Sequence, residues 1–299
     1  MGSPRVWLAG LGVVVVWASA FPAIRVAAPG LGVVGLAFVR LAVAALALLA
    51  MAAMTRVRVP ARRDVPLVAG CGFLGMTAYQ LLLGWGELDV PAGTASMIVA
   101  AAPLVSTGVA VLVLGERLTA TKVLGSLVAI VGVVTVCLAR AGLNLSAAVW
   151  IVVAATVVQG LYHPLTKPLL ARYTGFEVAT YTMVAGTVLV LPLVPRALAS
   201  MRVADGRSWW AAIYLGLVPS AVGCIWWGFV VARLPVSSST SLLYLVPAVA
   251  VVIAYLWLGE LPHAGELLGG LVAIVGVVLV TQGDRLVDRV RARRLPLRV

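Results

Sequence analysis

Ten long apolar runs follow one another along the chain of 299 residues, separated by short stretches rich in charged residues, glycine and proline. Each run has about 20 residues, the length that an α-helix needs to cross a hydrocarbon core of about 30 Å. The pattern predicts an all-α membrane protein with ten transmembrane helices, at residues 6–28, 32–54, 66–86, 92–114, 120–138, 147–170, 178–195, 209–231, 238–258 and 266–282.

The composition agrees with this pattern. Hydrophobic residues make up 63% of the chain and charged residues 11%, against about 25% charged residues in soluble domains. Such a chain has too little polar surface for an ordinary soluble enzyme, and too many apolar residues for a disordered chain. The three cysteines lie inside apolar runs, so they predict neither a disulfide framework nor a metal site.

The distribution of basic residues predicts the orientation. If the N-terminus lies inside, 16 of the 22 Lys and Arg residues fall on the inner side, two lie within spans, and four fall outside: Arg140, Arg196, Arg202 and Arg207. This bias predicts that both termini are cytoplasmic, in a bacterial inner membrane, with a basic tail at 285–299. Orientation and anionic lipid explain the net charge of +12 better than nucleic acid does.

An internal repeat relates the two halves of the chain. A shift of 144 residues aligns two segments without gaps, LGERLTATKVLGSLVAIVGVV at 114–134 and LGELPHAGELLGGLVAIVGVV at 258–278, and maps Pro103 onto Pro247. Near the N-terminus the corresponding shift is 142. Each copy holds five predicted spans, an odd number, so the second copy enters the membrane from the opposite side. The sequence therefore predicts two inverted repeats, 1–141 and 142–284, an arrangement common in secondary transporters.

Several features together point to a known family. They are Trp17-Ala18 in the first span, Arg40 in the second, and Gly-Glu pairs at 115–116 and 259–260 before glycine-rich helices. Over nearly its whole length the chain resembles the drug/metabolite transporter superfamily with two EamA-type repeats. The resemblance implies export of amino acids or related metabolites through a central cavity, lined mainly by spans 1, 3, 4, 6, 8 and 9. Thr182 stands where Arg40 would align, so any role of Arg40 is not duplicated.

The positions of the acidic residues narrow the chemistry. All ten carboxylates fall at span ends or in loops, and none is expected at the bilayer centre. A proton antiporter for cationic drugs usually needs a carboxylate there, to bind proton and cation in turn. No converging catalytic acid or nucleophile is visible either, so we expect no enzyme, no metal and no cofactor.

The candidate substrate contacts are polar and aromatic side chains within the spans. Gln159, Tyr162 and His163 share a helix face beside Pro164, and hydroxyl groups cluster at the start of the ninth span. The predicted substrate-binding residues are Trp17, Tyr79, Gln80, Met97, Gln159, Tyr162, His163, Trp227, Ser237, Ser241 and Tyr244. Two alternatives stay open: His163 as a packed core histidine, and the hydroxyls as partners of their own helix carbonyls.

Other residues have predicted roles in charge, bending and packing. Arg40 either pairs with backbone carbonyls or attracts a carboxylate into the outer cavity. Pro103 and Pro247 are predicted hinges, because a proline within a span leaves an unpaired carbonyl and a kink. Small residues such as Gly125 and Gly276 predict close packing between the fifth and tenth spans.

These features predict a secondary transporter that exports neutral amino acids, aromatic or aliphatic, or related small metabolites by alternating access. An aromatic and methionine-lined path with few charges suits such an amphipathic solute. Its expected partners are the small-molecule substrate and the lipid bilayer, without nucleic acid, and the chain is expected to be a monomer. The alternatives are a permease for another small metabolite or drug and, more remotely, a membrane-embedded enzyme or a lipid-handling scaffold.

Overall fold

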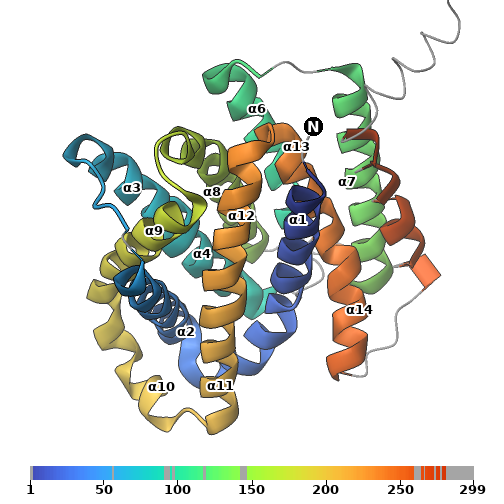
Figure 1. The fold of residues 1–299 in the computed structure, drawn as a ribbon. Coiled ribbons are helices and arrows are strands. Elements are labelled where there is room, and N and C mark those ends of the chain that lie inside the picture. Colours follow the sequence, from blue (N-terminus) through green and yellow to red (C-terminus); the bar gives the residue numbers. More distant parts are fainter. Residues whose placement is uncertain are drawn as a thin grey trace, which may run out of the picture.

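The computed structural model describes residues 3–55, 57–90, 95, 98–116, 119–141, 147–258, 264–265, 267–272, 274–276 and 278–280. Within these ranges every regular element is a helix or a helical turn (Figure 1). The predicted all-α class is therefore confirmed. Figure 1 shows the start of α1 (Pro4–Ala18) at one end of the bundle and the turn between α10 (Leu198–Val203) and α11 (Gly206–Leu215) at the other.

The first two predicted spans are carried by α1 (Pro4–Ala18) and α2 (Ala20–Met54). Together they form an apolar stretch of 51 residues, about 77 Å of helix at 1.5 Å per residue, which is too long for one crossing. Gly32 divides it, because its φ of 67° lies in the left-handed region that glycine adopts without steric cost. The interruption expected at 29–31 therefore lies at Gly32.

Two π-helical turns interrupt the third and eighth predicted spans. The third span consists of α3 (Val65–Cys71), the π-helical turn Gly72–Ala78 and α4 (Tyr79–Asp89). The eighth consists of α11 (Gly206–Leu215), the π-helical turn Gly216–Val222 and α12 (Gly223–Arg233). Both turns begin and end 144 residues apart, as do the ends of α4 and α12. The shift found in the sequence thus recurs in a rare backbone feature that is frequent at functional sites.

The paired prolines stand at the beginnings of helices. Pro103 lies in the first turn of α6 (Ala102–Leu114), and Pro247 in the first turn of α14 (Val246–Leu258). Before α14 the chain forms α13 (Val236–Thr240) and a 3₁₀ turn, Ser241–Leu245. Each proline therefore starts a helical segment, where its missing N–H costs nothing, rather than bending a continuous helix as expected.

The remaining elements are α7 (Ala120–Ala141), α8 (Ala147–Leu170), α9 (Gly175–Val190), a 3₁₀ turn at Leu191–Ala197 and α10 (Leu198–Val203). Pro164 lies inside α8 and has no N–H, so the carbonyl of Gly160 loses its partner in the helix. Ser106 of α6 donates its hydroxyl to this carbonyl at 2.9 Å. A neighbouring helix thus replaces the hydrogen bond that the proline removes.

The described helices have the length and surface expected in a bilayer. Six stretches are long and apolar enough to cross a membrane: Pro4–Met54, Arg62–Asp89, Ala147–Leu170, Gly175–Val203, Gly206–Arg233 and Val236–Trp257. Shorter apolar helices cover Ala102–Leu114, Ala120–Gly132 and Leu267–Val280. Large apolar side chains are exposed on the outside, such as Leu112, Leu256 and Trp150. Lipid can cover these side chains, whereas water could not do so without cost.

Backbone contacts join α7 to the last described helical residues. A Cβ atom on Gly125 would lie 2.6 Å from the backbone nitrogen of Val280, and one on Gly276 would lie 2.3 Å from that of Ala129. Such distances leave no room for a side chain, so the close packing predicted from the small residues is confirmed at these positions.

This contact gives a test by stability. Gly125→Ala should lower the free energy of unfolding by about 1–3 kcal/mol, because the new methyl group meets backbone atoms that cannot move aside. Gly108→Ala is the matched control, because a Cβ on Gly108 has no atom within 4 Å, and it should leave stability equal or slightly higher. The midpoint of thermal unfolding in detergent measures both variants. Equal midpoints would contradict the contact.

Candidate functional site

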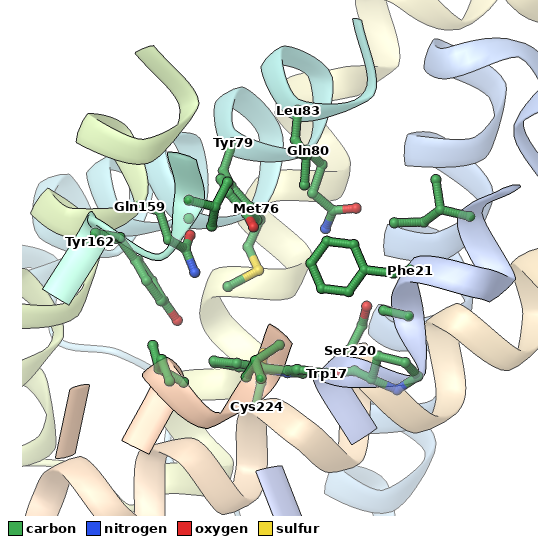
Figure 2. Close-up of a pocket in the computed structure, with 18 of the residues that line it drawn as sticks. Trp17, Phe21, Met76, Tyr79, Gln80, Leu83, Gln159, Tyr162, Ser220 and Cys224 are labelled. Carbon is green, nitrogen blue, oxygen red and sulfur yellow. The ribbon is translucent and has the colours of Figure 1, made fainter. Parts of the chain in front are cut away.

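A cavity of about 110 Å³ lies between helices from both ends of the sequence (Figure 2). On this measure one water needs about 10–15 Å³, so the cavity has room for a small solute. Its walls are mainly apolar and aromatic, with Phe21, Met76 and Met183 among them, and its polar groups include Arg40 and Ser220. Most lining residues lie in spans 1, 3, 4, 6, 8 and 9, as the family resemblance implies. Met183 of α9 and Arg40 in the second half of α2 also line the cavity.

Many lining residues correspond to each other through the internal repeat. At a shift of 144 the pairs are Gly75 and Pro219, Met76 and Ser220, Gln80 and Cys224, Val99 and Leu243, and Ala102 and Val246. At a shift of 142 they are Trp17 and Gln159, and Ala20 and Tyr162. Both π-helical turns contribute to the lining. The cavity is therefore built largely from the same positions in both copies.

Five predicted substrate contacts meet in this cavity: Trp17, Tyr79, Gln80, Gln159 and Tyr162. The predicted hinge residue Pro247 also lines it. Trp17 donates its indole N–H to the carbonyl of Pro219 at 3.0 Å, which orients the ring as one wall. Met97, the further predicted contact in the fourth span, lies outside the described residues.

His163 and Trp227 lie behind Trp17 and outside the cavity lining. The indole N–H of Trp227 donates to Nδ1 of His163 at 3.1 Å, and the His163 ring stacks on Trp17 with 6.5 Å between ring centroids. His163 is fully buried, and its Nε2 has no hydrogen-bond partner among the described residues. This geometry fits the interpretation of His163 as a packed core residue, which supports the Trp17 wall from behind.

The predicted contacts of the ninth span also lie outside the lining. Ser241 donates to the carbonyl of Ser238 at 2.9 Å, as the alternative of bonding within the helix expects. Ser237 donates to a carboxylate oxygen of Glu116 at 2.9 Å. Tyr244 is buried in an apolar cluster, and the hinge candidate Pro103 is buried in α6. No described hydroxyl of Ser237, Ser241 or Tyr244 reaches this cavity.

The first Gly-Glu pair anchors the entry to the ninth span. Gly115 has a φ of 66°, which turns the chain after α6. The carboxylate of Glu116 then accepts the backbone N–H groups of Val236 at 2.6 Å and Ser237 at 3.2 Å. The motif therefore holds the first turn of α13 to the end of α6. The second pair, 259–260, lies outside the described residues.

The lining residues that sequence reasoning missed include Phe21, Met76, Met183, Ser220 and Cys224. Apolar and small side chains occur in every span, so residue type alone does not distinguish a cavity wall from a lipid-facing position. The repeat offered a usable signal, because Cys224 stands 144 residues after Gln80, which was already a candidate contact.

Arg40 is the charged residue among the described side chains that line this cavity. Its Nε donates to the hydroxyl of Ser220 at 2.7 Å. The ion pairs of Glu177 with Arg58 and of Asp64 with Arg172 lie outside this cavity. The guanidinium thus adds a positive charge to an otherwise uncharged lining.

A second cavity, of about 600 Å³, adjoins the first. Both are lined by Ile24, Arg40, Tyr79, Gln80 and Leu83. The second cavity adds charged groups from Arg25, Glu87 and Asp89, and it includes the exposed residue Leu88. Residues 87–89, expected in a loop, form the last turn of α4. The apolar cavity therefore adjoins a more polar one that reaches the surface.

Polar contacts join helices at the other end of the third predicted span. Arg58 binds Glu177 with an Nε to Oε1 distance of 3.0 Å, and this bond raises the pKa of Arg58. Arg172 pairs with Asp64, which also accepts the hydroxyl of Tyr173 at 2.7 Å. These contacts tie the segment before α3 to the turn between α8 and α9. Because Arg58 is largely exposed, its pair stabilises this arrangement only slightly.

Comparison with known proteins identifies the family. Residues 5–138 and 146–282 each match the EamA-like transporter family.

The chain belongs to the EamA-like transporter family.

The resemblance found in the sequence is thereby confirmed, and this EamA-family chain is a membrane transporter rather than an enzyme.

Proteins that are similar to this EamA-family chain are named as transporters or exporters. It is 50% identical over 280 residues, 94% of each chain, to the "Probable terminal-alkyne amino-acid exporter" of Streptantibioticus cattleyicolor. It is 33% identical to the "Uncharacterized transporter YdfC" of Bacillus subtilis, over 87% of this chain and 86% of that protein. A solved crystal structure matches it with a TM-score of 0.80, covering 96% of this chain and 100% of that chain at 19% identity, which shows the fold alone.

The cavity of this EamA-family transporter can be tested by thiol labelling. Cys224 lines the cavity, whereas Cys71 is fully buried in the core. A small membrane-permeant methanethiosulfonate should therefore modify Cys224 faster than Cys71, as measured by mass spectrometry of the protein in detergent. Cys224→Ser is the control that removes the labelled peptide. Equal labelling of Cys71 and Cys224 would contradict the assigned cavity.

Proposed function

We propose that this transporter exports neutral amino acids, with aromatic or aliphatic side chains, or closely related small metabolites, across the bacterial inner membrane. The observation that carries the proposal is the cavity, in which aromatic and sulfur-containing walls surround a guanidinium. Apolar walls suit the side chain of such a solute, and a few polar groups suit its charged end.

The relatives support the same class of substrate. The Streptantibioticus cattleyicolor protein, half of whose aligned residues are identical, is named for a terminal-alkyne amino acid. An alkyne side chain is short and apolar, so it belongs to the aliphatic part of the proposed range. The shared chemistry is an amino-acid backbone with an uncharged side chain.

The proposed architecture is ten transmembrane helices in two inverted five-helix repeats, 1–141 and 142–284. Two separate family matches, at 5–138 and 146–282, support the division. The two π-helical turns at a shift of 144, and the lining residues that correspond at the same shift, support it further. In the predicted orientation both termini, including the basic tail at 285–299, are cytoplasmic.

The proposed mechanism is alternating access. In the predicted orientation, Arg58, Glu177 and Glu116 lie at the cytoplasmic end, where their contacts join neighbouring helices. The polar cavity beside Glu87 lies toward the outer end. The arrangement therefore corresponds to a state that is closed inward, and export requires the cytoplasmic contacts to open so that substrate can enter.

Flux measurements test the proposed function. Proteoliposomes loaded with radiolabelled phenylalanine or leucine should release the amino acid faster than protein-free liposomes. Trp17→Leu should raise KM about 10- to 100-fold, because it removes an aromatic wall of the cavity. Trp150→Leu is the matched control, because Trp150 is 67% exposed on the outside of the bundle, and its KM should not change. Absence of flux for every neutral amino acid would contradict the proposal.

The paired prolines test the proposed hinge. Replacing Pro103 and Pro247 by Ala removes the ring that disfavours a helical conformation in the preceding residue, so the segment before each helix can join it and the joint becomes stiffer. The double variant should have a lower maximal rate of efflux. Pro103→Ala alone should lower the rate without changing KM, because Pro103 does not line the cavity. Pro195→Ala, at an exposed proline, is the control. Unchanged efflux in the double variant would remove the hinge role.

A further inference from the structure

The charged residue of the cavity has no charged counterpart in the other copy of the repeat. Arg40 aligns with Thr182 at the shift of 142 that relates the early parts of the repeats. Thr182 is fully buried and donates its hydroxyl to the carbonyl of Val178 in its own helix at 2.9 Å. A cavity lined by matching positions therefore has its guanidinium on one side, so an unsymmetrical ligand finds two different ends.

Arg40 is held in place by a neutral group. Its Nε donates to Ser220 at 2.7 Å, and among the described residues it has no ion pair with a carboxylate. Arg40 is half-buried, and it lines both cavities. A guanidinium stays protonated even at low polarity, and an unpaired charge at membrane depth is costly. An anion at this point would remove the cost, which makes Arg40 a candidate ligand-binding residue.

The geometry of the guanidinium favours a planar anion with two oxygen atoms. The Nε–H group of Arg40 is already bonded to Ser220. The two terminal nitrogen atoms therefore keep their N–H donors, which form a fork that matches a carboxylate. The alternative considered from the sequence, pairing with backbone carbonyls, is not the contact observed. Glu87 lines the neighbouring cavity with Arg40 and attracts it electrostatically, but it forms no direct ion pair with the guanidinium.

We propose that Arg40 binds the α-carboxylate of the transported amino acid, with Ser220 orienting the guanidinium, so that the substrate lies with its carboxylate at the junction of the two cavities. This assignment rests on the proposed function. The side chain of the substrate then lies among Trp17, Met76 and Met183, in the apolar cavity. Figure 2 shows Met76 between Gln159 on one side and Ser220 on the other.

An oxygen without a hydrogen-bond partner adds a second difference between the two copies of the repeat. Gln159 lines the apolar cavity, and its Oε1 has no hydrogen-bond partner among the described residues. Since Gln159 is the counterpart of Trp17 in the second copy, the copies differ here as well. In this assignment the contact between Arg40 and the carboxylate sets the direction in which the substrate binds.

Ligands without the carboxylate test the assignment on the unaltered protein. Phenylalanine, its amide and phenethylamine share a ring and an amino group, but only phenylalanine has a carboxylate. In competition with labelled phenylalanine efflux from proteoliposomes, the amide and the amine should inhibit at least about tenfold more weakly than phenylalanine, because they lose hydrogen bonds to a charged group. Equal inhibition by phenethylamine would overturn the assignment.

Variants test the same point from the protein side. Arg40→Gln should raise the KM for phenylalanine about 10- to 100-fold and abolish the discrimination against phenethylamine. Arg40→Lys keeps the charge but loses the two-point fork, so its KM should lie between those of Arg40→Gln and the unaltered protein. Ser220→Ala should raise KM by less than Arg40→Gln does. Arg207→Gln removes an exposed arginine and is the matched control. An unchanged KM in Arg40→Gln would overturn the assignment.

A binding measurement separates failure of the assignment from failure of the proposed function. Thermal unfolding in detergent, with millimolar phenylalanine or phenylacetate, should show stabilisation of the unaltered protein and none of Arg40→Gln. If no amino acid is exported but both carboxylates stabilise only proteins with Arg40, the proposed function fails and the carboxylate site stands. If amino acids are exported and Arg40→Gln is stabilised equally, the function stands and the assignment is wrong.

Discussion

Inside a bilayer every backbone polar group has to find its partner within the protein, and the cavity lies where the helices depart from regular hydrogen bonding. The carbonyl of Pro219, in one π-helical turn, accepts the indole N–H of Trp17. The carbonyl of Gly160, which Pro164 deprives of its partner, accepts the hydroxyl of Ser106. In each case a side chain of a neighbouring helix donates the hydrogen bond. The irregular segments are therefore tied to other helices, and several of them line the cavity.

The internal repeat explains the shape of the cavity, and the differences between the copies explain its chemistry. Corresponding positions place residues from both halves around one space, including both π-helical turns. At these positions the side chains differ, as with Met76 and Ser220. Arg40 and Thr182 differ most, since one lines the cavity with a charge and the other bonds within its own helix. Duplication thus accounts for a central cavity, and divergence accounts for its two chemically different sides.

The helices were predictable because span length and apolar composition are local properties. The positions at which the helices are interrupted were less predictable. Gly32, rather than the preceding Pro29 and Gly30, takes the positive φ, and it lies opposite Ser200 of the neighbouring segment. Pro103 and Pro247 were paired through the repeat, but their place in the first turn of a helix was not predicted. For the site, Trp17 and Gln159 were predicted as substrate contacts and line the cavity, whereas His163 lies behind the wall.

The amino-acid sequence by itself determined the all-α membrane class, the family and the repeat, because these follow from composition, periodicity and residue identity along the chain. It also located Arg40 within a predicted span and showed that Thr182, not an arginine, stands at the corresponding position of the second repeat. Only the tertiary structure decided which polar side chains face the cavity. The rotation of each helix about its axis depends on its neighbours, so Ser241 bonds to its own helix while Ser220, in a π-helical turn, reaches Arg40.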